Sequence, residues 1–521
     1  MYKKNKTSPL LSGKELILIK RISILLTQER DIDTLFGYIL DAAIEFTSAE
    51  GATIYMVDDE NKQLKFIKIF NSKMKVSLNA TEITWPPISL FNEDNQPNLR
   101  NLAALAYHKK RSYNFPDVYD QDIFDSSGTM SYDKRNNYRT RSIVAIPMMD
   151  HKDNIIGIIQ LINAIDNENK VIVPFTEQQI SNLEVLTSIS AILMNNHKLI
   201  SDLQTTFYQF IKSIAWAIDR KSKHFSGHIE RVSILVNMFA EEINTYQGCE
   251  FAYKTVTFNE DELEELNIAG LMHDLGKIIT PMHILDKSAK LEKIFNRIEL
   301  IKERISHIMT VLDFEMAQGN SKINEKLGVL KKQLAEHKKF LTRINTGREF
   351  LNDTEKERLS EIHKFRYFYN DKELKIITDD EFYNLSIRMG TLNREDIDII
   401  REHAFVTGEM LEQIRFPKYL ENAPLFAKSH HEKLNGKGYP NGLVAPELPL
   451  QSRILTLADV FEALTATRPY KNSKTLSDTY AILQRMVDAY EIDADLYEFA
   501  KGSGLFMKYA NKFLEKKQID I

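Results

Sequence analysis

Residues 272–278 read Met-His-Asp-Leu-Gly-Lys-Ile, and they place an imidazole beside a carboxylate in a part of the chain with helical periodicity. Outward from this stretch, six of the thirteen histidines fall in four short clusters, and an aspartate follows on another expected helix. The whole set is His224, His228, His273, Asp274, His403, His430, His431 and Asp459. Histidines four residues apart share one face of a helix, a spacing that suits imidazoles converging on a metal ion. We therefore expect a metal centre in a helical domain.

The donor types narrow the choice of metal. In the His273-Asp274 pair, the carboxylate can bridge two ions while the imidazole binds one. Nitrogen and oxygen donors without a thiolate favour iron or manganese over a structural zinc. Cys249 is the only cysteine, which excludes a disulfide framework, a cysteine-rich zinc site and an iron–sulfur cluster. It also indicates a reducing, cytoplasmic compartment.

Three stretches together resemble a known family. Residues 272–278 resemble the signature of the HD superfamily of metal-dependent phosphohydrolases. Two further stretches narrow the resemblance to the HD-GYP subfamily: 430–443, His-His-Glu-Lys-Leu-Asn-Gly-Lys-Gly-Tyr-Pro-Asn-Gly-Leu, and 459–471, Asp-Val-Phe-Glu-Ala-Leu-Thr-Ala-Thr-Arg-Pro-Tyr-Lys. The resemblance covers 205–286 and 390–515. It implies an all-α HD-GYP domain over 205–515 that is interrupted from Lys287 and resumes at Gly390.

The resemblance implies hydrolysis of cyclic di-GMP, a bacterial second messenger, to pGpG, with a second cut to GMP left open. It assigns metal binding to His228, His273, Asp274, His403, His430, His431 and Asp459. His224 stands where some members carry a glutamate associated with a third metal. Two and three divalent ions, iron or manganese, therefore both fit the sequence.

The resemblance also implies substrate contacts. Asp274 and Lys277 are the expected catalytic residues, and Lys277, Arg468 and Lys471 match positions that contact substrate phosphates. Residues 438–440, Gly438, Tyr439 and Pro440, are expected to shape a loop beside the metals and the substrate. The sequence departs from the family pattern at Glu462 and at Asn435, where many members have aspartate. We expect both departures to alter substrate contacts and to leave the metals in place.

Two alternatives to cyclic di-GMP hydrolysis stay open. One is a receptor that binds a cyclic dinucleotide or a partner without turnover, and the other is a phosphodiesterase for cyclic GMP-AMP. The seven core ligand positions and Lys277 favour an enzyme, because a receptor would not require them.

The N-terminal part, residues 11–199, mixes helix and strand signals. Helices are expected over 14–30 and 32–47, and strands over 52–57, 64–69, 142–148 and 155–163. An antiparallel sheet with helices outside it is an α+β module. The phrase at 156–163, Ile-Gly-Ile-Ile-Gln-Leu-Ile-Asn, followed by Phe175-Thr176-Glu177, resembles a GAF domain. This implies a pocket for a small molecule that the sequence does not identify, and a GAF fold used only for dimerisation fits equally well.

A heptad pattern joins the two parts over a linking helix at 180–222. Its first positions are Leu186, Leu193, Ile200, Phe207 and Ile214, and its fourth positions are Ile189, Asn196, Leu203, Phe210 and Ala217. Such a seam predicts a parallel homodimer through residues 186–217, with Asn196 fixing the register. The alternative is one long helix that packs its apolar stripe first on the GAF sheet and then on the C-terminal bundle.

Residues 288–389 interrupt the HD-GYP pattern with two further heptad runs, so we expect an inserted helical hairpin that turns near 318–320. The 68 Lys and Arg against 73 Asp and Glu give a net charge of −5, which removes the broad positive field that nucleic acid or an anionic membrane would need. No run approaches the roughly 18 apolar residues of a membrane span. We therefore expect neither nucleic acid nor membrane as a partner.

Overall fold

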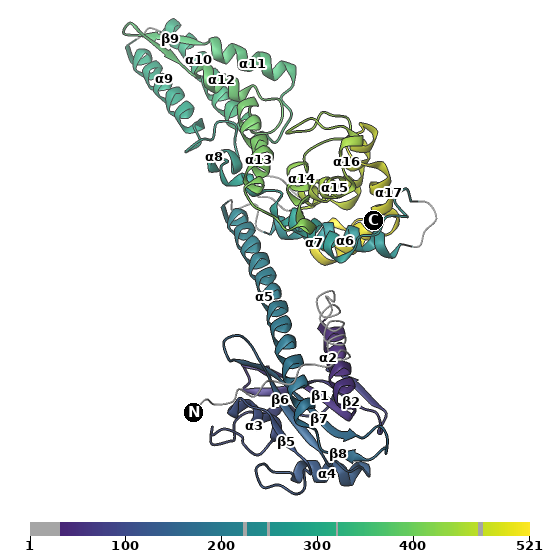
Figure 1. The fold of residues 1–521 in the computed structure, drawn as a ribbon. Coiled ribbons are helices and arrows are strands. Elements are labelled where there is room, and N and C mark those ends of the chain that lie inside the picture. The colour runs from purple at the N-terminus through teal and green to yellow at the C-terminus, as the bar shows by residue number, and fades with distance from the viewer. Residues whose placement is uncertain (1–31, 222–226, 247–250, 319–320, 467–472) are drawn as a thin grey trace, which may run out of the picture. The chain divides into compact units, whose positions relative to one another are not determined.

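The computed structural model describes residues 32–221, 227–246, 251–318, 321–466 and 473–521. The chain divides into two compact units, residues 1–206 and 207–521 (Figure 1). Among the described residues, every helix is either too short or too polar to cross a lipid bilayer. The predicted helix at 14–30 lies outside the described residues.

The first unit is built on one antiparallel sheet with the strand order β3-β2-β1-β7-β6-β5, to which β4 and β8 add short edge pairings. Its elements are α2 (Ile32–Thr47), β1 (Ala49–Asp58), β2 (Gln63–Asn71), β3 (Val76–Asn79), β4 (Ile88–Ser89), α3 (Leu102–Lys109), β5 (Tyr113–Phe115), α4 (Ser127–Asn136), β6 (Ile143–Met149), β7 (Ile155–Ile165), β8 (Ile172–Val173) and α5 (Glu177–Lys221). The predicted α+β fold, with four predicted strands and the helix at 32–47, is confirmed.

Both faces of this sheet are covered, which explains why its central strands are almost continuously apolar. Ile54 and Ile159 point into a core shared with α2 and α5. Tyr55 and Ile158, the next residues along the two strands, point into a second core under α3. Because successive side chains of a strand point to opposite faces of the sheet, each central strand contributes residues to both cores.

Helix α5 is a single helix of 45 residues. Near its start, Leu186 packs in the core of the first unit, and near its end Ile211 packs in the core of the second. Between them the predicted seam residues Ile200, Leu203 and Phe210 are 59%, 68% and 61% exposed. The two ends of the seam therefore pack within the units, and its middle residues are exposed to solvent. The homodimer stays a prediction.

The second unit is helical, as predicted. Around its core lie α6 (His228–Thr245), α7 (Glu260–Met272), η1 (Leu275–Ile278), α8 (Met282–Leu285), α13 (Arg394–Glu412), η2 (Lys418–Leu420), α14 (Ala423–Lys428), η3 (Ala445–Glu447), α15 (Leu450–Thr465), α16 (Leu476–Asp488), α17 (Ala494–Gly502), α18 (Leu505–Phe513) and η4 (Lys516–Gln518). The centre of the core is aromatic: the rings of Phe461 and Phe506 stack 4.1 Å apart, and Phe239 meets Phe506 edge-on.

The insertion contains the predicted hairpin, α9 (Ile298–Gln318) and α10 (Ser321–Ile344). Two polar contacts, Lys331 with Asp313 and Lys338 with Ser306, show that the helices run antiparallel. The insertion is larger than a hairpin, because α11 (Asp353–Lys364), β9 (Arg366–Tyr369), β10 (Lys372–Lys375) and α12 (Asp379–Leu385) follow and share an apolar core with it.

The two short strands β9 and β10 were not predicted. They form a hairpin in which Tyr369 pairs with Lys372. The two loop residues, Asn370 and Asp371, both have positive φ, 47° and 59°. A two-residue loop with this conformation favours Asn and Asp, so the signal was present in the sequence.

Candidate metal centre

Five segments of the second unit bring the predicted ligands together. His228 is the first residue of α6, His273 follows the last residue of α7, and Asp274 precedes η1. His403 lies in the middle of α13, and Asp459 lies in α15. His430 and His431 follow α14. The seven residues predicted as core ligands therefore converge on one place, although they are spread over more than 230 residues of chain.

Asp274 lies at the centre of the group. Its Oδ2 atom lies 3.4 Å from Nε2 of His228 and 3.3 Å from Nε2 of His273. Its Oδ1 atom lies 3.4 Å from Nε2 of His403 and 3.9 Å from Nε2 of His430. The two carboxylate oxygens thus face different pairs of imidazoles, as a carboxylate that bridges two ions would.

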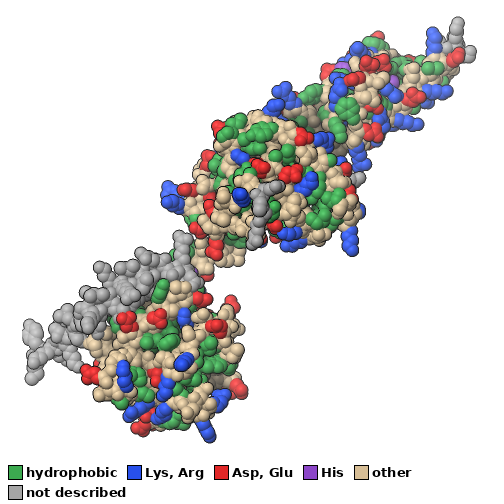
Figure 2. Space-filling view, turned by 90° about the vertical axis from the view of Figure 1, so that its right-hand side faces the viewer, with side chains coloured by type: hydrophobic (Ala, Val, Ile, Leu, Met, Phe, Trp, Pro, Cys, Tyr) green, Lys and Arg blue, Asp and Glu red, His purple; other side chains and the backbone are tan. Residues whose placement is uncertain are grey.

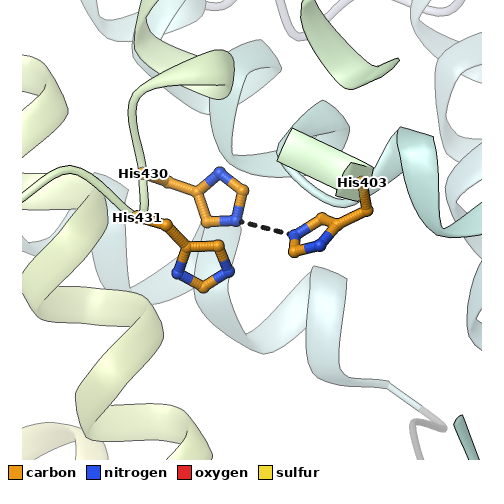
Figure 3. Close-up of side chains that lie close together, drawn as sticks. All are labelled: His403, His430 and His431. Atoms are coloured by element: carbon orange, nitrogen blue, oxygen red, sulfur yellow. Dashed lines mark hydrogen bonds between the residues drawn. The ribbon is translucent and has the colours of Figure 1, made fainter. Parts of the chain in front are cut away.

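Asp459 completes the set on the other side. Its Oδ1 atom lies 3.3 Å from Nε2 of His228, and its Oδ2 atom lies 4.0 Å from Nδ1 of His431. Three overlapping groups have donor atoms within 4.8 Å of one another: His228 with His273 and Asp459, His273 with Asp274 and His430, and His403 with His430 and His431. Figure 3 shows the last group, in which the imidazoles of His403 and His430 face each other with their Nε2 atoms 3.4 Å apart.

Hydrogen bonds fix the direction of the imidazoles. The Nδ1 atom of His273 contacts the Gly270 carbonyl oxygen at 2.7 Å, and that of His430 contacts the Ala427 carbonyl oxygen at 2.6 Å. His403 makes the same contact with Ile400. In each case the carbonyl is three residues earlier in the chain. An Nδ1–H that donates to a carbonyl leaves Nε2 with a lone pair for a metal.

His228 is oriented differently, by the carboxylate of Glu462, which contacts its Nδ1 atom. Glu462 is 1% exposed, and Arg231 donates to its other oxygen at 2.7 Å. This corrects the expectation that Glu462 contacts substrate: it lies behind His228, where it positions a ligand. No local sequence pattern indicates this role, because Glu462 and His228 are 234 positions apart in the chain.

The donor set fits metal ions. Nε2 of His273 and Oδ1 of Asp274 are buried, and neither makes a hydrogen bond. Buried polar atoms without partners are rare in folded proteins, and these two lie among other imidazoles and carboxylates. A divalent cation between them would satisfy both atoms, and the mixed nitrogen and oxygen donors suit iron or manganese.

The pKa shifts of most candidate ligands favour the protonation states that bind metal. Burial and the neighbouring imidazoles hold the pKa of His430 well below its ordinary value, and burial lowers the pKa of His431 to about 3. Burial opposes ionisation of Asp274, but Lys277 and His273 hold the pKa of its carboxyl well below the usual range. Most of the candidate ligands are therefore in the form that binds metal, with neutral imidazoles and ionised carboxylates.

His228 is the exception. Burial opposes its charge, but Glu462, Asp274 and Asp459 raise its pKa well above the ordinary value.

The predicted glycine-rich loop lies beside the metal centre. A Cβ atom on Gly438 would lie 2.4 Å from the backbone nitrogen of Lys433, so only glycine fits there. Buried Glu432 accepts hydrogen bonds from the amides of Asn441, at 2.7 Å, and Leu443, at 3.0 Å, and so closes the loop. The Tyr439 ring lies with its centroid 4.7 Å from that of His431, and Pro440 follows through a cis peptide bond.

Of the residues predicted to contact substrate, the structure describes only some. Lys277 places its ammonium nitrogen 2.5 Å from Oδ2 of Asp274, and its contact with substrate stays a prediction. Arg468, Lys471 and His224 lie outside the described residues. A further cation, Arg401, was missed: its guanidinium lies 5.4 Å from the centre of the Tyr439 ring.

The comparisons with known proteins agree with both units. A GAF domain family model matches residues 31–194, and two HD domain models match 225–342 and 375–496. The chain is 34% identical over 112 residues to the cyclic di-GMP phosphodiesterase response regulator RpfG of Xanthomonas campestris pv. campestris, which is 21% of this chain and 29% of that protein. It is 32% identical over 124 residues to 3'3'-cGAMP-specific phosphodiesterase 1 of Vibrio cholerae, which is 24% of this chain and 27% of that protein.

The matched stretches span less than a third of the length of these curated relatives. Among solved structures, the chain resembles the GAF domain from an Acinetobacter phosphoenolpyruvate-protein phosphotransferase, with 15% identity, a TM-score of 0.27 and coverage of 37% of this chain and 99% of that one. The chain thus carries a GAF domain at 31–194, followed by HD domain sequence of the kind found in cyclic di-GMP and cGAMP phosphodiesterases.

Proposed function

We propose that this protein is a metal-dependent phosphodiesterase that hydrolyses cyclic di-GMP. The observation that carries the proposal is the convergence of the seven predicted ligands around Asp274, with two buried donor atoms that lack a hydrogen-bond partner. Relatives named as cyclic di-GMP phosphodiesterases support the substrate.

The residues fall into distinct roles in this proposal. Two ions would be held by His228, His273, Asp274, His403, His430, His431 and Asp459, and His224, which lies outside the described residues, is the predicted ligand of a third. Iron or manganese ions at such a site supply Lewis acidity and activate water for attack on phosphorus. Lys277, next to Asp274, supplies positive charge that stabilises the developing charge on the phosphoryl oxygens. Tyr439, Arg468 and Lys471 would hold the rest of the substrate.

The distribution of surface charge favours attraction of the substrate by a few cations at the site over attraction by the whole surface. On the face shown in Figure 2, Lys and Arg side chains alternate with Asp and Glu over both units, with no large field of one sign. A doubly charged dinucleotide would therefore depend on a nearby cation such as Lys277.

The test is direct. Metal-reconstituted protein, prepared without oxygen, is incubated separately with cyclic di-GMP, cyclic GMP-AMP and cyclic di-AMP, and the products are separated. Formation of pGpG from cyclic di-GMP is the expected result. The variant Lys277→Ala should keep its metals and lose most of its turnover, because it acts on substrate charge. Binding without hydrolysis would instead indicate a receptor.

Cyclic GMP-AMP is the second candidate substrate. It is favoured by three relatives from Vibrio cholerae that are named as 3'3'-cGAMP-specific phosphodiesterases, at 32% to 37% identity. The same incubation decides between the two substrates by their relative kcat/KM.

We also propose that the GAF domain regulates this activity through a small molecule. A cavity of about 300 Å³ in the first unit has aromatic walls that include Tyr55, Phe66, Trp85 and Tyr132. Among the described residues that line it, Asp125 is the one charged side chain. Hydrogen bonds from Ser127 lower the pKa of Asp125, so the carboxyl is ionised. Such a lining favours an uncharged or cationic aromatic ligand over a cyclic nucleotide, whose phosphate would meet no cation there. Cyclic AMP and cyclic GMP should accordingly leave both Tm and turnover unchanged.

A further inference from the structure

A cavity of about 430 Å³ in the second unit lies where the insertion ends and α13 begins. One wall is the end of the insertion, with Tyr383, Ser386 and Ile387. The opposite wall is the first half of α13, with Arg394, Asp398 and Arg401. The insertion thus contributes one wall of a cavity, and α13, which carries the candidate ligand His403, contributes another.

The cavity adjoins the proposed reaction site. Arg401 lines it and also lies 5.4 Å from the centre of the Tyr439 ring, which in turn lies beside His431. Along α13, Arg401 comes two residues before the ligand His403, and Asp398 comes five residues before it. At 1.5 Å per residue, Asp398 lies about 7.5 Å along the helix from His403.

Buried contacts hold the insertion wall in place. The ammonium of Lys290, 1% exposed, donates to the carbonyl oxygens of Leu385 and Ile387 at 3.2 Å and 2.5 Å. Lys287, also buried, forms an ion pair of 2.6 Å with Asp396 on α13. The Lys290 contacts hold the end of the insertion, including Ile387 of the cavity wall, against its beginning. The Lys287–Asp396 ion pair ties the residue just before the insertion to α13.

The polar groups of the cavity match guanine. A guanine base offers N–H donors at N1 and N2 and acceptors at O6 and N7. A carboxylate only accepts hydrogen bonds, and a guanidinium only donates them. Asp398 and Arg401 therefore complement the two edges of guanine, whereas adenine has no donor at the corresponding N1 and C2 positions. Both side chains are exposed and line the cavity, and the Arg401 guanidinium lies over the Tyr439 ring.

We propose that this cavity binds one guanine base of the cyclic dinucleotide, and that the insertion thereby contributes to base specificity. The inference rests on the proposed function for the position of the substrate. It assigns Asp398 and Arg401 as specificity residues and gives the insertion, through Tyr383 and Ser386, the role of a binding wall.

The experiment uses the full chain, loaded with metal. Asp398→Asn and Arg401→Met alter the polar groups, and Ser386→Trp fills the cavity from the insertion side. Glu409→Gln, an exposed position on the same helix outside the cavity, is the control. Affinity for cyclic di-GMP and cyclic di-AMP is measured by calorimetry, and kcat and KM are measured with cyclic di-GMP and with bis(p-nitrophenyl) phosphate, which has no base.

All three cavity variants should bind cyclic di-GMP at least about tenfold more weakly and show a smaller preference for it over cyclic di-AMP. Their metal content and their rate with bis(p-nitrophenyl) phosphate should match those of the control. Unchanged affinity and preference in Asp398→Asn and Arg401→Met would overturn the inference. The proposed function fails separately, if the wild type binds cyclic di-GMP but does not hydrolyse it.

Discussion

A Cβ atom on Gly276 would lie 2.0 Å from the carbonyl oxygen of His403, which is too close for any two non-bonded atoms. The turn after Asp274 therefore packs directly against the backbone of α13. Thr407, one helical turn after His403, accepts a hydrogen bond from the Gly276 amide at 2.9 Å and donates to the carbonyl oxygen of His273 at 3.1 Å. These contacts set the distance between two ligand-bearing segments.

Gly276→Ala should separate these segments. Forcing a methyl group into a tightly packed contact costs about 1–3 kcal/mol, and the shift should also reduce metal content. Denaturant unfolding and elemental analysis measure the two effects. Gly328→Ala in α10 is the control, because nothing lies within 4 Å of its added Cβ and alanine stabilises a helix by up to about 1 kcal/mol. A Gly276→Ala protein with normal stability and full metal content would contradict this account.

The candidate ligands could be picked out from the sequence because each cluster lies in a short motif whose residue types point to metal binding. It could not predict the residues that support them. Glu462 contacts His228 across 234 positions of chain, and Arg401 meets Tyr439 only after α13 packs beside the loop. Such pairs depend on tertiary packing, which no local pattern encodes. The β9–β10 hairpin is different, because Asn370 and Asp371 are a local turn signal that can be read from the sequence.

Asp274→Ala should remove more than one metal ion per chain, since its two oxygens face different imidazole pairs. His431→Ala should remove at most one, because His431 belongs to a single group of donors. The same limit is predicted for His224→Ala, at a position outside the described residues. Elemental analysis of reconstituted proteins counts the ions. A wild type with one equivalent or none would refute a multinuclear centre.

Glu462→Ala should weaken metal binding without removing a ligand. Loss of the group that orients a metal-binding histidine typically costs 10- to 100-fold in metal affinity, and Arg231 would lose its buried partner as well. Competition with a chelator of known affinity measures the change. Glu498→Ala, an exposed glutamate on α17, should match the wild type. Equal affinities in the two variants would mean that Glu462 does not position His228.

Lys290 should make the insertion's stability depend on pH. Burial lowers the pKa of its ammonium to about 8 from 10.5, so between these values the unfolded chain binds more protons than the native protein. Stability then rises with pH across this window, whereas below pH 8 the cost of the buried charge is fully present. The Tm of the wild type minus the Tm of Lys290→Met should therefore increase from pH 7.5 to pH 10. For Lys293→Met, which changes an exposed side chain, the difference should stay constant.

The last prediction concerns how the GAF domain reaches the metal centre. Helix α5 runs from Glu177 to Lys221 without interruption, and its exposed apolar residues Leu203 and Phe210 follow the predicted heptad. A parallel homodimer would bury them. Inserting one residue after Asn196 rotates everything beyond it by about 100° relative to the first unit, which breaks the seam and should change activity. Inserting seven residues rotates it by only about 20° from register, so activity should largely return. Light scattering that shows a monomer at micromolar concentration would rule out this coupling. Turnover that is the same with both insertions would also rule it out, because a coupling by rotation of α5 requires activity to depend on the number of residues inserted.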